Sequence, residues 1–427
     1  MAFDVPTTRG YYSSLSDGWT YLNGGERAQI PERVLSTMAT AFRAAPKSLP
    51  GEAASGSHSR GQEAGITAGH QFAAMARRAF ADVVGGRPEG VVLGPSRDVL
   101  VQNLAHALGR RLRLGTGMVL PRSGDAVLQV PFRRAADMFG ARARFAEADL
   151  STGAVPAWQY DSLVDEDTRL VVVSAADPFV GAVAPVPDIV SRVRAASRAL
   201  VLVDVSSYAP YRVVDMGRIG ADVLLVDAAG WGGPEVSALV FRDPSLPDRM
   251  ASLSLLPDAR GRDRLEVSPV APSLLGGVSE SVRHLADLDP TGRGTRRHRI
   301  VSSMPQVAEY LHGLTNRLID ALGNLDQVYI VGIDGEGSDG DGPDSDATAV
   351  ADRVPRVSFV VTDVPAPTVV RRLLDNNLVT SAVRPGESAL LEAMGVMEAG
   401  GAVTVGLQPF NTPHDVDQLV RAVASLG

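Results

Sequence analysis

The sequence predicts an α/β protein: a mainly parallel sheet flanked by helices, followed by a smaller α+β unit. Two observations predict it. Short, continuous apolar runs recur in the first half of the chain, as expected of strands buried on both faces. These runs are 91–93, 170–173, 200–203 and 223–226. Helical patterns lie between them, and alternating strands and helices form βαβ units with helices on both sheet faces.

Two of the intervening helices can be placed by their periodicity. Before Gly85, apolar residues fall at positions that share one face of a helix: 72, 75, 76, 79, 80 and 83. The segment 187–199 is a second candidate. Both would cover the predicted sheet.

The last third of the chain has a different pattern. We expect a long helix over 305–322, strands over 357–361 and 403–407, and a helix over 367–376 between them. The final helix has a clear start, because Thr412 can cap it, Pro413 suits its first turn and Asp415 completes a capping box. This pattern predicts a smaller α+β domain.

Gly/Pro-rich joints at 244–257 and 287–297 suggest how the chain divides. We expect an N-terminal segment, 1–30, that packs on the small domain. A large domain then spans 31–285, and a small C-terminal domain spans 286–427. Residues 334–346 are rich in Gly and Asp, which predicts a disordered acidic insertion.

Composition excludes several classes of protein. Among 427 residues, 41 are Lys or Arg and 49 are Asp or Glu, so the net charge is −8 and a nucleic-acid partner is not expected. Cysteine is absent, which excludes disulfides, cysteine-ligated metals and cysteine nucleophiles. No apolar stretch is long enough to span a membrane and no targeting signal opens the chain. We therefore expect a cytoplasmic protein with no membrane partner.

Generic motifs give little support for other chemistry. Gly335, Gly337 and Gly340 match a dinucleotide-binding pattern, but Asp341-Gly342-Pro343-Asp344 follows where a helix is required. No pair among the seven histidines has the i, i+4 spacing of metal ligands, so no metal is expected. No G-x-S-x-G elbow indicates a serine hydrolase.

A set of ordered segments resembles the class V aminotransferases, specifically their cysteine-desulfurase-like branch. The set is Tyr21-Leu22-Asn23-Gly24-Gly25, Val91-Val92-Leu93-Gly94, Asp204-Val205-Ser206-Ser207-Tyr208-Ala209-Pro210, Arg264-Leu265-Glu266 and Gly406-Leu407 with Asn411-Thr412. The resemblance covers nearly the whole chain apart from the acidic insertion. It implies the fold-type-I PLP-dependent transferase fold, a seven-stranded-type sheet, a homodimer and pyridoxal phosphate (PLP) as cofactor.

The resemblance also assigns family roles to particular positions. Asp204 corresponds to the acid that pairs with the pyridine nitrogen, and Gly94, Ser96 and Ser207 to cofactor-binding positions. The family's S-x-x-K-x-x-G-P pattern reads here Asp227-Ala228-Ala229-Gly230-Trp231-Gly232-Gly233-Pro234, so Gly230 stands at the position of the Schiff-base lysine. Glycine has no amine for that role. Only one lysine exists in the chain, Lys47, in a loop far earlier, and we expect it at the surface.

Other family positions are altered as well. Asp227 and Asp98 stand where the phosphate-binding serine and threonine are expected, and each carboxylate about 4 Å from a phosphate would cost roughly 4 kcal/mol at an effective dielectric near 20. Asp125 stands at the ring-stacking position. Pro269 and Thr404 replace the residue that closes on the partner's phosphate and the substrate-binding arginine.

These substitutions predict a catalytically degenerate homologue that acts by binding a ligand or a partner. If Asp98, Asp125, Asp204 and Asp227 share one cleft, its acidic lining favours a small cationic or amine ligand. Two alternatives stay open: an active PLP-dependent aminotransferase or desulfurase-type enzyme, and a non-PLP enzyme that uses the carboxylates for acid–base work.

Overall fold

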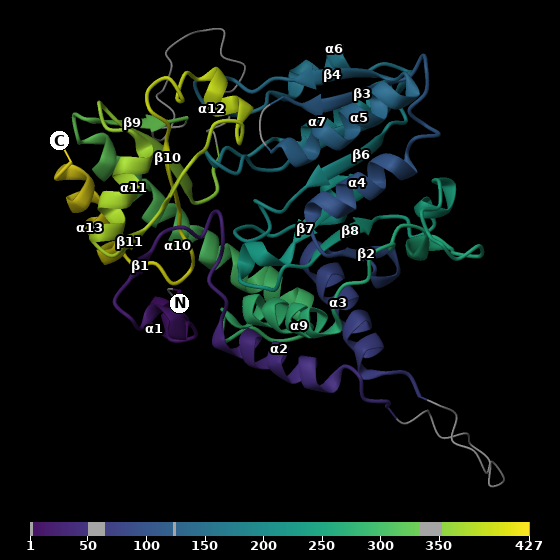
Figure 1. Cartoon of the computed structure of the whole chain (residues 1–427), viewed down its shortest axis with the longest axis horizontal. Coiled ribbons are helices and arrows are strands. Elements are labelled where there is room, and N and C mark those ends of the chain that lie inside the picture. Colours follow the sequence, from purple (N-terminus) through teal and green to yellow (C-terminus); the bar gives the residue numbers. More distant parts are fainter. Residues whose placement is uncertain (1–2, 50–64, 123–124, 333–351, 427) are drawn as a thin grey trace.

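A computed structural model describes residues 3–49, 65–122, 125–332 and 352–426. The expected insertion at 334–346, with its glycine motif, lies outside the described residues. Figure 1 shows a large domain built on a twisted sheet and a smaller domain beside it, with the N-terminal segment running between them.

The large domain contains a seven-stranded sheet. Its strands, in spatial order, are β2 (Val91–Gly94), β8 (Ser237–Phe241), β7 (Val223–Asp227), β6 (Leu200–Asp204), β5 (Thr168–Ser174), β3 (Gly117–Pro121) and β4 (Arg142–Ala146). Only β8 runs against its neighbours, and the other adjacent pairs are parallel. The four predicted apolar runs are strands of this sheet, but 91–93 pairs antiparallel with β8. The link from β7 to β8 is too short for the crossover that a parallel pair needs.

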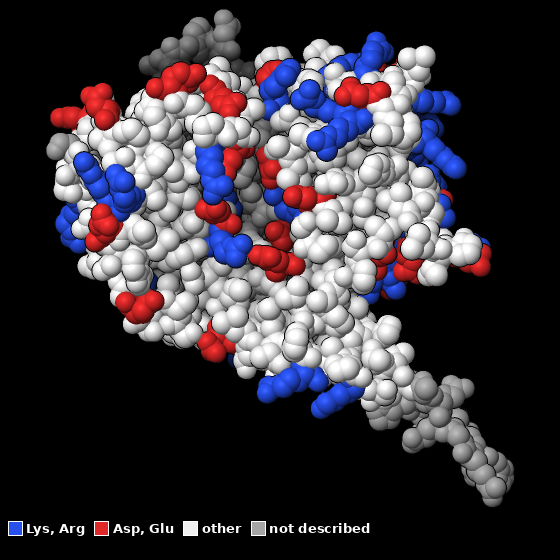
Figure 2. Space-filling model, in the orientation of Figure 1, with Lys and Arg blue, Asp and Glu red and all other residues white. Residues whose placement is uncertain are grey.

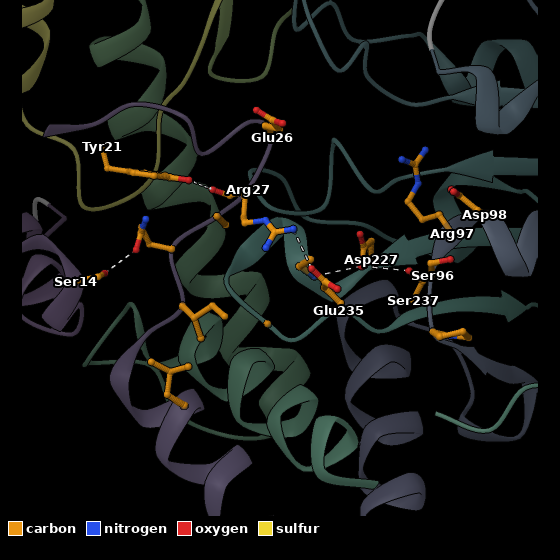
Figure 3. A pocket seen from close by; sticks show the side chains of 17 residues that line it. Ser14, Tyr21, Glu26, Arg27, Ser96, Arg97, Asp98, Asp227, Glu235 and Ser237 are labelled. Atoms are coloured by element: carbon orange, nitrogen blue, oxygen red, sulfur yellow. Dashed lines mark hydrogen bonds and ion pairs between the residues drawn. The ribbon is translucent and has the colours of Figure 1, made fainter. Parts of the chain in front are cut away.

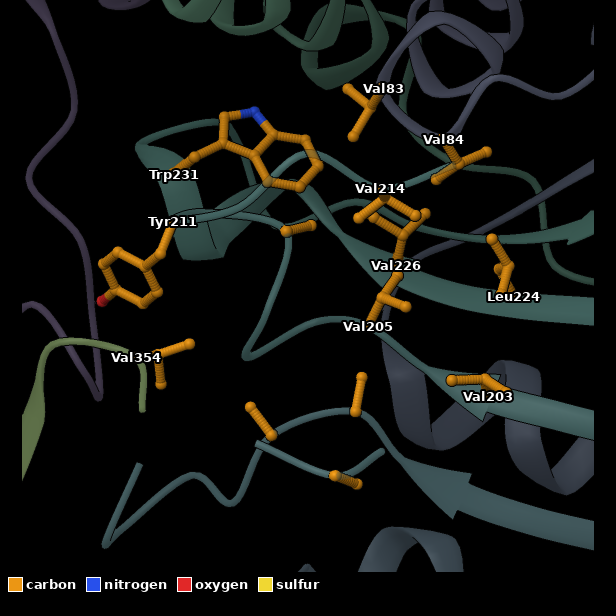
Figure 4. Packing of buried hydrophobic residues seen from close by; sticks show 14 of the residues in the cluster. Val83, Val84, Val203, Val205, Tyr211, Val214, Leu224, Val226, Trp231 and Val354 are labelled. Atoms are coloured by element: carbon orange, nitrogen blue, oxygen red, sulfur yellow. The ribbon is translucent and has the colours of Figure 1, made fainter. Parts of the chain in front are cut away.

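Helices cover both faces of this sheet, as the alternating pattern predicts. The large-domain helices are α2 (Glu32–Ala44), α3 (Ala68–Val84), α4 (Arg97–Ala107), α5 (Val130–Phe139), α6 (Tyr160–Leu163), α7 (Val186–Ala196), α8 (Met216–Ile219) and α9 (Pro272–Asp287). Within β6, Val201 and Val203 pack in one buried cluster, whereas Leu200 and Leu202 pack in another on the opposite face. Figure 4 shows part of the first cluster, in which Val205 and Val226 lie between Val203 on one side and Trp231 on the other. A strand buried on both sides explains its continuous apolar run.

The small domain packs helices against an antiparallel sheet in the order β12 (Ser381–Ala382), β13 (Val403–Gly406), β10 (Arg356–Val361) and β9 (Val328–Val331). Its helices are α10 (Arg296–Gly323), α11 (Ala366–Asp375), α12 (Ala389–Ala393) and α13 (Pro413–Ala424). The predicted capping box of α13 is present. The predicted start of α10 at Pro305 is wrong, since Thr295 caps the helix and Pro305 lies inside it.

The N-terminal segment packs on the small domain before it crosses to the large one. It contains α1 (Val5–Arg9) and β1 (Thr20–Tyr21), which pairs in parallel with β11 (Leu378–Val379). Beyond β1 the chain hydrogen-bonds to β13, because Gly406 donates to Leu22 (2.8 Å) and Gly24 donates to Gly406 (3.0 Å). This crossing places residues 25–30 between the two domains.

The close contact at Gly406 provides a test of this crossing. A Cβ at Gly406 would lie 2.1 Å from the backbone nitrogen of Gly25, so Gly406→Ala forces the crossing segment away. We expect a loss of about 1–3 kcal/mol of stability, measured as a lower melting temperature.

Gly313→Ala, in α10, is the matched control, because a Cβ there meets nothing within 4 Å. Equal melting temperatures for both variants would contradict the close crossing.

Candidate functional site

The carboxyl ends of strands β6 and β7 meet the first turn of α4 at one edge of the sheet. Asp204 ends β6, Asp227 ends β7, and Arg97 is the first residue of α4. In open α/β sheets this edge is where ligands bind. Two cavities of about 580 and 480 Å³ open beside it, and Glu26 of the crossing segment lines both.

Arg97 forms the centre of the site. Its Nη1 donates to Asp125 at 2.8 Å, and its Nη2 donates to Asp204. The Asp204 side chain is only 4% exposed, and its other oxygen accepts from the Ser206 backbone N–H at 2.9 Å. Each carboxylate oxygen of Asp204 therefore already has a partner within the chain.

The surroundings of Arg97 favour the protonated, positively charged form of its guanidinium. Burial acts to lower the pKa of Arg97, but the neighbouring carboxylates of Asp204 and Asp125 more than offset it, and the pKa lies above its ordinary value. Its Nε is buried and has no hydrogen-bond partner among the described residues. Arg97 is thus a permanent cation that neutralises two of the four acids predicted to line the cleft.

Asp227 lies close to this pair and lines the larger cavity. It accepts from the Ala229 backbone N–H (3.3 Å) and from Ser237 Oγ (3.2 Å). Burial raises the pKa of Asp227 above the ordinary carboxyl value, although these hydrogen bonds and Arg97 act in the opposite direction. Figure 3 shows Asp227, Ser237 and Ser96 grouped beside Arg97.

Gly230 lies in the 3-10 turn Ala228–Trp231 that follows β7. A Cβ at this position would lie 3.0 Å from Cγ of Pro210 and 3.2 Å from the carbonyl oxygen of Ser206. The position expected to carry the lysine therefore holds no side chain and has little room for one.

The other predicted cofactor-binding residues, Ser96, Gly94 and Ser207, have different surroundings in the structure. Ser96 caps α4 by accepting from the Val99 N–H and, with Asp98, lines the larger cavity. Gly94 packs so closely that a Cβ would lie 2.5 Å from Leu100. Ser207 is half-buried in the turn after β6 and lines neither cavity.

Thr404, Pro269 and Lys47, three further residues singled out from the sequence, lie in different parts of the fold. Thr404 lines the smaller cavity together with Asp125, and its hydroxyl lies 3.1 Å from that of Ser358. Pro269 is exposed in the segment before α9 and lines neither cavity. Lys47 is exposed and also lies outside both, as expected of a surface residue.

Two arginines at the site were missed from the sequence. In the sequence Arg97 lies between Ser96 and Asp98, and its place between two residues already assigned to the cofactor site was the available signal. Arg356, on β10, is only 5% exposed and lines the smaller cavity; its Nη1 donates to the Pro178 carbonyl at 2.9 Å. Its only sequence signal is an arginine at the start of an apolar strand.

The cleft is therefore of mixed charge rather than simply acidic. Arg27 and Glu235 at its edge form an ion pair at 3.0 Å, and Arg97 pairs with Asp204 and Asp125. Glu26, Asp98 and Asp227 add negative charge to the lining of the larger cavity. Figure 2 shows charged groups of both signs around the hollow between the domains.

Comparisons with known proteins agree with this fold. Residues 20–250 match the family model of the class V aminotransferases. The uncharacterized protein MT3887 of Mycobacterium tuberculosis is 40% identical over 427 residues, covering all of both chains. The aminotransferase-like protein FGM3 of Gibberella zeae is 25% identical over 354 residues, which is 82% of this chain and 81% of that protein.

Solved structures show the same fold. The cysteine desulfurase of Thermococcus onnurineus superposes with a TM-score of 0.79 at 16% identity, covering 99% of this chain and 97% of the other. The Escherichia coli cysteine desulfurase CsdA gives 0.76 at 17% identity, covering 99% and 98%. The chain belongs to the class V aminotransferase family and has the fold of the PLP-dependent cysteine desulfurases.

The residues present do not fit PLP as this family binds it. Arg97 already pairs with Asp204, the acid that the pyridine nitrogen requires. Gly230 provides no amine, and the buried carboxylate of Asp227 stands where the resemblance implies a phosphate-binding serine. The site thus lacks what three parts of the cofactor need. The guanidinium of Arg97 occupies the partner of the pyridine nitrogen, no amine is present for the aldehyde, and a carboxylate would repel the phosphate.

The ion pair at Arg97 can be tested by coupled substitutions. Arg97→Met leaves the buried carboxylate of Asp204 uncompensated, and we expect it to cost about 3–5 kcal/mol of stability. Adding Asp204→Asn removes that charge and should recover more than half of the loss. Denaturant unfolding of both variants measures the coupling, and additive effects would contradict it.

The raised pKa of Asp227 predicts how the stability of the protein depends on pH. The sign of this dependence is opposite to that of an ordinary paired carboxylate. Because its folded pKa is raised, ionised Asp227 costs stability at neutral pH, and this cost disappears as the pH falls through the folded pKa. Asp227→Asn should therefore be more stable than the parent at neutral pH, and the gain should shrink toward acid pH.

Thermal unfolding across the pH range measures this difference. Glu309→Gln, at an exposed position of α10, is the control and should show no such trend. A gain for Asp227→Asn that does not depend on pH would contradict the raised pKa.

Proposed function

We propose that this chain is a degenerate member of its family, in which PLP-dependent catalysis is lost and the interdomain cleft binds a small ligand. The observation that carries this proposal is the pairing of Arg97 with Asp204. The chain's own guanidinium takes the partner that the cofactor ring needs.

Two further observations support the loss of catalysis. A side chain at Gly230 would press on Pro210 and Ser206, so the backbone there is packed for glycine. The only lysine, Lys47, is exposed and lines neither cavity of the cleft. No other amine-bearing side chain remains for a Schiff base.

We propose a cationic or amine-bearing ligand for the larger cavity. Arg97 neutralises Asp204 and Asp125, but Glu26, Asp98 and Asp227 still line a space of about 580 Å³. This volume lies in the range of small-molecule sites, and a cation would find charge-assisted hydrogen bonds there. In this proposal the cleft binds, rather than converts, its ligand.

We propose that the protein works as a cytoplasmic homodimer. Exposed apolar side chains extend from the cleft along α2 to the start of α3: Leu35, which lines the larger cavity, is 42% exposed, Phe42 is 73% and Ile66 is 62%. A second copy that covers this face would bury these side chains and narrow the cleft mouth.

The first experiment adds PLP to the purified protein and follows its visible absorbance before and after borohydride reduction. We expect no tight uptake and no reduced label on Lys47. A reducible chromophore mapped to Lys47 would overturn the proposal and favour an active PLP enzyme.

The second experiment measures melting shifts with spermidine and, separately, with citrate. We expect spermidine to raise the melting temperature and citrate to leave it unchanged. Glu26→Gln and Asp98→Asn should each weaken the binding of spermidine about tenfold.

Glu309→Gln is again the control and should retain the full shift. A lack of any spermidine shift, or a shift that persists in Glu26→Gln and Asp98→Asn, would contradict the ligand class.

A further inference from the structure

A second surface lies on the large domain, away from the cleft. We call it the α4–α5 surface. It consists of the turn after α4 with the residues that follow it, 109–117, and of α5 with the residues that follow it, 130–143. Four large apolar side chains are exposed there: Leu114 (86%), Met138 (68%), Phe139 (37%) and Val130 (36%).

The two segments form one continuous surface. A Cβ at Gly140 would lie 3.6 Å from Leu114, and a Cβ at Gly109 would lie 2.4 Å from the Phe139 ring. The backbone N–H of Arg142 donates to Thr116 at 2.9 Å, which ties the start of β4 to the turn after α4. The exposed apolar groups are therefore neighbours in space.

Arginine dominates the charge of this surface. Residues 109–117 and 130–143 contain six arginines and one acid, Asp137, so they carry 6 − 1 = +5 in a chain of −8. The six are Arg110, Arg111, Arg113, Arg133, Arg134 and Arg142. None of them forms an ion pair with a carboxylate of the described residues. Five of the six are exposed and Arg111 is half-buried.

Two acids near the same sheet edge already have arginine partners. Asp165 pairs with Arg144, and Asp167 lies 3.7 Å from Arg169. Figure 2 shows blue groups gathered over the upper right of the molecule, where Figure 1 places β3, β4 and α5. The positive charge of this edge is thus available to an anionic partner.

We propose that the α4–α5 surface docks on an anionic lipid surface. Leu114 and Met138 protrude, so a fluid apolar phase can cover them without a complementary pocket. The surrounding guanidinium groups then meet lipid phosphates. A nucleic acid would satisfy the arginines but leave these apolar side chains in water.

The position of this surface is compatible with an open cleft. Leu114 and Arg142 lie at the amino-terminal ends of β3 and β4, whereas the cleft lies at the carboxyl ends of the parallel strands. The sequence expectation of no membrane partner rested on the lack of a spanning segment. None of the described helices is long and apolar enough to cross a membrane, but a docking surface does not need one.

Vesicle flotation tests the proposal with the full-length protein. We expect it to float with vesicles that contain phosphatidylcholine and phosphatidylglycerol, and not with phosphatidylcholine alone, and to detach at high salt. The double variant Leu114→Ser, Met138→Ser should bind about tenfold more weakly, because it loses the apolar contact. Arg113→Glu with Arg134→Glu should lose binding to a similar or greater extent.

Helix α11 offers a matched control, since Arg371, Arg372 and Leu374 are exposed there. Arg371→Glu with Arg372→Glu, and separately Leu374→Ser, should float like the parent. Circular dichroism confirms that every variant is folded.

Three outcomes would overturn the proposal. The first is no flotation with either vesicle, as expected if the surface serves a protein partner. The second is a loss of binding with the arginine variants alone, as expected of a simple polyanion site. The third is an equal loss of binding with the α11 variants. The spermidine test of the cleft is independent, so failure of one proposal leaves the other standing.

Discussion

The ion pair between Arg97 and Asp204 is the interaction on which the character of this site depends. A buried carboxylate at the end of a parallel strand must be paired, because an uncompensated charge there is costly. Within the described chain the compensation comes from the first turn of α4, through a residue that also holds Asp125. One arginine thus pairs both with the buried Asp204 and with Asp125, the residue that caps the 3-10 turn Ala126–Leu128.

The surrounding substitutions are consistent with this pairing. Asp227, at the end of the neighbouring strand, adds negative charge that helps to keep Arg97 protonated, and its own raised pKa reflects its burial. Gly230 packs against Pro210 and the Ser206 carbonyl, in a turn whose indole, Trp231, hydrogen-bonds to Ser281 of α9. The turn to which the family resemblance assigns the Schiff-base lysine is here closely packed around a glycine.

The cleft and the α4–α5 surface lie at opposite edges of the large-domain sheet. The cleft lies at the carboxyl ends of the strands and is shaped by the crossing segment at Gly25 and Glu26. The α4–α5 surface lies at the opposite ends of β3 and β4, where helix C-termini and turns meet solvent. Parallel α/β sheets separate these two edges by construction, so one edge can change without disturbing the other.

The sequence by itself determined the fold class, most strand positions, the capping box of α13 and the absence of a lysine near the site. These are local properties: continuous apolar runs, a cap at fixed spacing and the identity of Gly230. It failed where a local signal was ambiguous, as at Pro305, which suits a helix start but lies inside α10.

Only the tertiary structure decided what the acids do. From the sequence, Asp98, Asp125, Asp204 and Asp227 would give the cleft an acidic lining if all four met there. In the fold, two of them are neutralised by Arg97, a residue whose partners lie 28 and 107 positions away along the chain. No spacing in the sequence predicts such partners, because strand order and helix packing, rather than a local pattern, bring them into contact.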